Sequence, residues 1–112
     1  MSGDTNVLVD SEDNSVTGSA NNVDDSDNNQ VAGNANDLDD ALSNTVAGDT
    51  NIVNDSDNNT IAGSENSVVE DSNDNTVGGV SNELAADADA NTVGGTDNVA
   101  SNSDNNLSLI HI

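Results

Sequence analysis

The chain has 112 residues, of which 22 are Asp or Glu and none is Lys or Arg, so its formal net charge is −22. It also lacks Cys and aromatic residues. This composition excludes disulfides and thiolate metal sites, and it offers no basic patch for nucleic acid or an anionic membrane. Few groups remain for catalysis, so we expect no enzyme activity. Low hydrophobicity with high charge is typical of disorder, and a disordered acidic repeat that folds only with Ca²⁺ or high salt is one hypothesis.

An internal repeat favours a folded chain instead. Residues 1–9 form a partial N-terminal repeat, six units cover residues 10–102, and residues 103–106 begin another. The consensus is D-S-D-N-N-T-V-A-G-S-x-N-x-V-x, with 15 residues in the early units and 16 in the later ones. Repeats of this length indicate stacked structural units. The units begin at Asp10, Asp25, Asp40, Asp55, Asp71 and Asp87.

Five positions of the unit recur with the same kind of residue. Position 5 is Asn14, Asn29, Asn44, Asn59, Asn75 and Asn91. Position 7 is Val or Ile, and position 9 is always Gly. Position 14 is apolar, and position 12 is Asn21, Asn36, Asn51, Asn66, Asn82 and Asn98.

Each half of the unit reads Asn-x-Val, which is the period-2 pattern of a strand. We therefore predict an all-β fold, a β-solenoid (β-roll) with two strands per coil and about seven coils. Positions 5, 7, 12 and 14 point inward, and the Asn columns form hydrogen-bonded ladders. The Gly after the first strand permits a tight turn at positive φ, and the Asp-Ser-Asp-Asn stretch forms the other turn.

The last six residues, 107–112, leave both the repeat and its composition. They read Leu-Ser-Leu-Ile-His-Ile, and we interpret them as a translated sequencing adapter and the chain as a truncated reading frame from environmental DNA. His111, the only His, is then neither catalyst nor ligand. The alternative is a terminal apolar strand that caps the last coil.

Acidic residues at positions 1 and 3 suggest a cation site. Stacked in register, they form rows of carboxylates roughly 5 Å apart that repel each other by about 0.8 kcal/mol per pair in water. Either Ca²⁺ binds between coils or high salt screens the rows, as in a halophilic protein. The candidate Ca²⁺ ligands are Asp25, Asp27, Asp55, Asp57, Asp87 and Asp89.

Position 6 faces outward and carries a file of Thr residues beside the small residues of position 8. This file resembles the ice-binding face of β-solenoid antifreeze proteins, and ice binding is an alternative function. The alternative interpretation is that Thr recurs at position 6 because it has a high β-strand propensity. The file consists of Thr45, Thr60, Thr76 and Thr92.

The half-repeat N-x-V-x-G-x-x, from Asn14 to about Asn98, resembles the S-x-A-x-G-x-x repeats in the heads of trimeric autotransporter adhesins. The resemblance implies a left-handed β-roll, a trimer, an extracellular or cell-surface location, and binding to a surface ligand that the sequence does not identify. It brings no catalytic residues. The chain departs from the family because every second half-repeat lacks the Gly.

Overall fold

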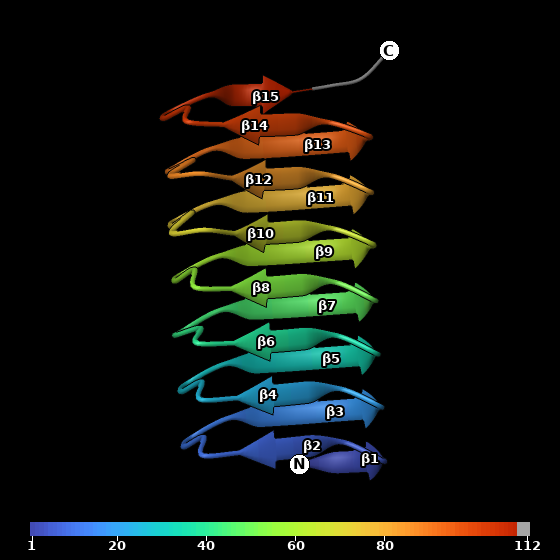
Figure 1. Cartoon of the computed structure of the whole chain (residues 1–112). Helices are drawn as coiled ribbons and strands as arrows, with labels where there is room; N and C mark the ends of the chain where they lie inside the picture. The colour runs from blue at the N-terminus through green and yellow to red at the C-terminus, as the bar shows by residue number, and fades with distance from the viewer. Residues whose placement is uncertain (110–112) are drawn as a thin grey trace.

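The computed structural model describes residues 1–109, and the described chain is a stack of short parallel strands (Figure 1). Strands alternate between two sheets. Sheet A has eight strands, namely β1 (Ser2–Asp4), β3 (Ser15–Ser19), β5 (Gln30–Asn34), β7 (Thr45–Asp49), β9 (Thr60–Ser64), β11 (Thr76–Val80), β13 (Thr92–Thr96) and β15 (Leu107–Leu109). Sheet B has seven, namely β2 (Val7–Val9), β4 (Asn22–Asp24), β6 (Asp37–Asp39), β8 (Ile52–Asn54), β10 (Ser67–Val69), β12 (Glu83–Ala85) and β14 (Val99–Ser101).

Each coil contributes one strand to each sheet, and the next coil repeats the pair one level up (Figure 1). In the register, Val16 lies beside Val31 and Val31 beside Val46, a step of one repeat. The prediction of an all-β solenoid with two strands per coil and about seven coils is confirmed. Within residues 1–109, no helix is long and apolar enough to cross a membrane.

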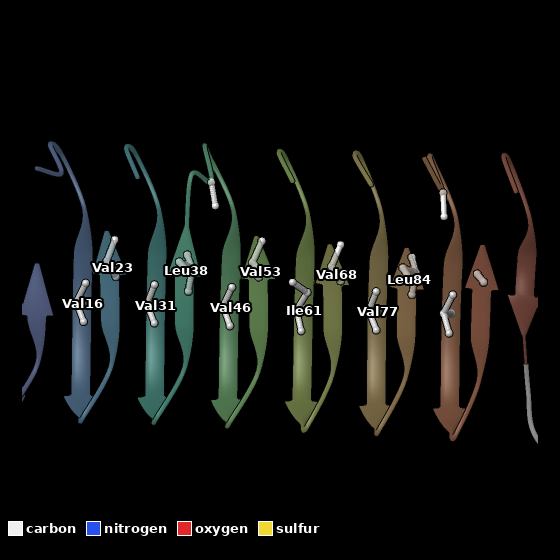
Figure 2. Packing of buried hydrophobic residues seen from close by; sticks show 14 residues of the cluster. Val16, Val23, Val31, Leu38, Val46, Val53, Ile61, Val68, Val77 and Leu84 are labelled. Carbon is white, nitrogen blue, oxygen red and sulfur yellow. The ribbon is translucent and has the colours of Figure 1, made fainter. Parts of the chain in front are cut away.

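The core is a thin layer between the two sheets. Figure 2 shows one column of apolar side chains along each sheet, facing the other sheet. Both columns are buried, as the pattern at positions 7 and 14 predicts. They comprise Val16, Val31, Val46, Ile61, Val77 and Val93 on sheet A, and Val23, Leu38, Val53, Val68, Leu84 and Ala100 on sheet B.

The Asn column at position 12 is a continuous amide ladder. Asn36 donates from both its backbone N and its side-chain Nδ2 to Oδ1 of Asn21, at 3.1 and 3.0 Å. Its Nδ2 also donates to the carbonyl oxygen of Gly48 at 2.9 Å. Each buried Asn thus connects three successive coils. Within the described residues every buried side-chain polar atom has a partner, so the predicted ladder is confirmed.

The Asn column at position 5 is built differently. Asn59 accepts the backbone N–H of Asn75 at 2.8 Å, and its Nδ2 donates to the carbonyl oxygen of Ser72 at 3.0 Å. Most bonds of this column therefore join an amide side chain to the backbone of the next coil. The acceptor of each Nδ2 is the backbone carbonyl of the residue at position 2 in the next coil. That residue therefore lies in the interior, between the two sheets.

The Asp-Ser-Asp-Asn stretch forms the turn between the short strand and the next long strand, and its residue at position 2 points inward. Residues at this position form a third buried column, between an exposed residue at position 1 and an exposed or half-buried residue at position 3. The Ser26 hydroxyl donates to the carbonyl oxygen of Asp24 and accepts the backbone N–H of Ala41, at 2.7 and 2.9 Å. The column is Ser26, Ala41, Ser56, Ser72 and Ala88, all with no exposed surface.

The Gly column at position 9 does have positive φ, but the reason differs from a turn after the strand. Gly48 is the fourth residue of β7 and has φ of 130°. A Cβ on Gly48 would overlap the carbonyl oxygen of Gly63 and lie 2.8 Å from its carbonyl carbon. Gly is therefore required because the backbones of neighbouring coils approach closely at this point.

The turns use left-handed residues at positions 1, 4 and 11. Position 1 is Asp in every unit and position 4 is Asp or Asn in four of the six units, which are residue types that tolerate this conformation. The 16-residue coils place their extra residue in the turn after the short strand. Glu70 and Asp71 are consecutive left-handed residues, each with φ of 59°. The turn absorbs the insertion, so the strands above it stay in register.

The end of the chain continues the stack as far as it is described. β15 pairs with β13, with an irregular register between Leu107 and Leu109. This agrees with a strand on the last coil. The adapter origin of residues 107–112 stays a prediction, and His111 lies outside the described residues.

Candidate functional site

Positions 1 and 3 place the six predicted Ca²⁺ ligands on two different rows. Asp25, Asp55 and Asp87, at position 1, are exposed at left-handed corners with φ between 44° and 61°. Asp27, Asp57 and Asp89, at position 3, are half-buried on the next part of the same turn. The rows run along the stack; position 1 is Asp in every unit, whereas the position 3 row also contains the uncharged residues Leu42 and Asn73.

The position 3 row has a structural role that the sequence analysis missed. Oδ1 of Asp57 accepts the backbone N–H of Leu42, one coil earlier, at 2.8 Å. Asn73 then accepts the N–H of Asp57 at 2.6 Å, and Asp89 accepts the N–H of Asn73 at 2.7 Å. An amide and a carboxylate are interchangeable here, since only one oxygen is used. The row is therefore an acceptor ladder for backbone N–H groups.

Leu42 interrupts this ladder. It occupies position 3 of its coil, its side chain is 44% exposed, and it has no side-chain oxygen for the N–H of Asp27. The Asp27 carboxylate still accepts the N–H of Glu12. The interruption therefore affects only the step between the coils of Asp27 and Leu42.

The chain has no Lys or Arg to pair with its carboxylates, and on the outer surface Asn side chains donate hydrogen bonds to some of them instead. Nδ2 of Asn22 donates to Oδ1 of Asp37 at 2.9 Å, and Nδ2 of Asn54 donates to Oδ2 of Asp39 at 3.3 Å. An N–H dipole offsets part of the charge of a carboxylate without adding positive charge. On the outer face of sheet B the acidic residues lie in β4, β6 and β12, and amide–carboxylate pairs join β4 to β6 and β6 to β8. Val7, Val9, Ile52 and Val99 are exposed on the same face.

Carboxylates crowd most densely at the edge of β4 and β6. Partial removal from water and then the charges of Asp24 and Asp40 raise the pKa of Asp25 above its ordinary value of 3.8. Partial removal from water, with Asp40 and Asp24 next in size, also raises the pKa of Asp39. Both groups are held in the charged form against repulsion at neutral pH.

This crowding does not amount to a metal centre. Over the residues described, no group of three or more His, Cys, Asp or Glu side chains is arranged to hold a metal ion. A protein Ca²⁺ site takes six to eight oxygen ligands. Binding of Ca²⁺ by the position 1 and position 3 Asp residues stays a prediction.

The outer face of sheet A carries few charges, namely Asp4 and Asp49 at the ends of β1 and β7. We define the neutral face as the outward residues at positions 6 and 8 of sheet A, in strands β3 to β13. None of them is Asp or Glu, although the chain holds 22 acidic residues. The face consists of Ser15, Gln30, Thr45, Thr60, Thr76 and Thr92 at position 6, and Thr17, Ala32, Ala47, Ala62, Gly78 and Gly94 at position 8.

The predicted Thr file lies on this face without a break. Thr45 pairs with Thr60, Thr60 with Thr76, and Thr76 with Thr92 in the register of sheet A. All four side chains are exposed. Since neighbouring strands are about 4.8 Å apart, the hydroxyls form a straight row at that spacing.

The first coils of the neutral face are less regular. A shallow depression lies over β3, β5 and β7, where Gln30 replaces Thr; its outward lining is Ser15, Thr17, Gln30, Ala32, Thr45 and Ala47. The uniform part of the face therefore runs from β7 to β13. The neutral face can be found from the sequence alone by noting which repeat positions carry Asp or Glu. Positions 6 and 8 are the outward strand positions that contain no acidic residue in any unit.

No protein-family model and no curated protein matches the chain.

Proposed function

We propose that the protein is a non-catalytic, adhesin-like repeat module that acts outside the cell or at its surface as a rigid spacer with a repeating contact surface. The observation that supports this proposal is the register of the coils. Equivalent outward positions of successive coils lie one strand spacing apart, and at positions 6 and 8 they repeat similar residue types, as in Thr45 beside Thr60 and Ala47 beside Ala62. Such a surface suits a target that is itself repetitive.

The chemistry of the surface favours many weak contacts over one strong one. The chain has no Trp, Tyr, Phe or Arg, the residues that enrich binding hot spots. Affinity would then come from simultaneous engagement of several coils. The neutral face is the better contact surface, because carboxylates elsewhere would have to lose water or find cations before a partner could approach.

The resemblance to adhesin heads adds a specific expectation, a homotrimer. Size-exclusion chromatography with light scattering measures it directly on the chain at micromolar concentration. A trimer that persists on dilution supports the adhesin form of the proposal. A strict monomer contradicts that form and leaves the spacer with its repeating surface.

The second part of the proposal is that cations stabilise the solenoid, since no Lys or Arg offsets the net charge of −22. Far-UV circular dichroism in chelator, in millimolar Ca²⁺ and in molar KCl tests whether the solenoid needs them. Folding with Ca²⁺ alone supports specific sites, and folding only in KCl supports general screening. A coil spectrum in all three conditions contradicts a solenoid that folds on its own.

A single substitution separates the two roles of the position 3 row. Asp57→Asn keeps the oxygen that accepts the Leu42 N–H, as Asn73 does in its own coil, and removes one charge. If Ca²⁺ binds there, the variant loses Ca²⁺-dependent stabilisation. If it does not, the variant gains stability at low salt. Asp97→Asn, an exposed charge removal at position 11, is the matched control.

A further inference from the structure

We propose that the neutral face of sheet A binds the surface of ice, with the Thr file from β7 to β13 as the contact row. The inference rests on the proposed function, in which this face is the contact surface, and it names the target. Three properties of the face carry it: the absence of charge, the register of the hydroxyls and the flatness of the neighbouring row.

Charge is separated in this molecule by face. The acidic residues lie in the turns and on sheet B, and Asp4 and Asp49, at the ends of their strands, are the ones on sheet A. Carboxylates keep a strongly oriented hydration shell that does not fit the water lattice of ice. A face without any of them allows water to order on hydroxyl and methyl groups, while the acidic turns remain hydrated by liquid water.

The strand register places equivalent hydroxyl groups at a constant spacing along the face. Thr45, Thr60 and the two Thr residues that follow in the file occupy equivalent places on successive strands about 4.8 Å apart. This interval is of the order of the distance between equivalent water oxygens in crystalline ice. Thr is β-branched and therefore stiff at χ1, so the row of hydroxyls and methyls is held in place before contact.

The neighbouring row keeps the face flat. Position 8 beside the Thr file carries Ala47, Ala62, Gly78 and Gly94, so no large side chain stands above the hydroxyls. A crystal surface can then contact both rows at once. Protein partners usually need the reverse, a protruding aromatic or Arg anchor in a pocket, and the chain has neither residue type.

A second copy of the chain is the main competing occupant of this face. Two copies that meet there would bury only hydroxyl groups, Gln30, Ala and Gly, with no large apolar or basic side chain on this face to hold them together.

The test uses thermal hysteresis and retention of the folded chain in a growing ice hemisphere. Thr60→Glu places a charge in the middle of the file. Thr50→Glu makes the same change at an exposed turn residue outside the face. We expect activity in the parent chain, at least a tenfold loss for Thr60→Glu, and no more than a twofold change for Thr50→Glu. Circular dichroism of both variants establishes that the fold is retained, and Thr60→Val is used if Thr60→Glu unfolds.

Three results would overturn the inference. The folded parent chain could be excluded from ice and show no hysteresis. Thr60→Glu and Thr50→Glu could lose activity equally. Light scattering could show an oligomer that Thr60→Glu dissociates, which would identify a second copy as the occupant. The first and third results leave the repeating contact surface intact, whereas the proposed function itself fails if the chain does not form the solenoid.

Discussion

Gly48→Ala tests the close approach of neighbouring coils. Gly48 has φ of 130°, a region that L residues with a side chain rarely adopt. Its Cβ would overlap the carbonyl oxygen of Gly63 in the coil above and lie 3.1 Å from the Gly63 nitrogen. Both obstacles are backbone atoms, so no side-chain rotation relieves them. The two coils must separate locally to admit the methyl group.

The expected loss follows from these two effects. Strain at an unfavourable φ costs about 1–3 kcal/mol. Separating the coils weakens several hydrogen bonds between β7 and β9, each worth about 1 kcal/mol. We expect a loss of at least about 4 kcal/mol, the range of severe core substitutions. Domain stabilities are about 5–15 kcal/mol, so Gly48→Ala removes much or all of the stability.

Gly78→Ala is the control within the same sheet. Its Cβ would meet the Ala62 carbonyl oxygen at 3.9 Å, an ordinary contact, and its φ lies outside the left-handed region. The substitution removes the entropic cost of Gly in a strand, so we expect a gain of about 0.5–1 kcal/mol. Urea unfolding followed by far-UV circular dichroism measures both variants. Similar midpoints for the two would refute the steric argument.

The other predictions concern the hydrogen-bond ladders and pH. Leu42→Asn supplies an acceptor for the N–H of Asp27, and we expect a gain of about 1 kcal/mol in urea unfolding; no gain would show that the interruption is harmless. Asn59→Ala leaves a buried N–H and a buried C=O without partners, so a loss of about 2–5 kcal/mol is expected in the same assay. Because the folded pKa values of Asp25 and Asp39 are raised, the native state binds protons more readily than the unfolded chain. The unfolding free energy therefore falls as pH rises from the ordinary pKa of 3.8 through the raised values, and the melting temperature should be higher near pH 4 than at pH 7. A higher melting temperature at pH 7 would contradict the electrostatic argument.

The repeat in the sequence determines a large part of the solenoid architecture. Alternation at Asn59 and Ile61 specified which side chains point inward, because side chains of a strand alternate between its two faces. The 15-residue period then specified two strands per coil. The burial of position 2 was not predicted, since Ser is a common turn residue and periodicity over a turn carries no signal for burial.

By itself, the sequence determined the strand pattern, the coil length, the amide ladders and the exclusion of acid from positions 6 and 8, because each depends on a residue type recurring at a fixed interval. Only the tertiary structure decided how neighbouring coils meet. It showed that Gly48 is dictated by the backbone above it, that Asp57 accepts an N–H from the coil below, and that Ser26 lies inside. These are contacts between residues 15 or more apart, and their geometry depends on how tightly one coil rests on the next.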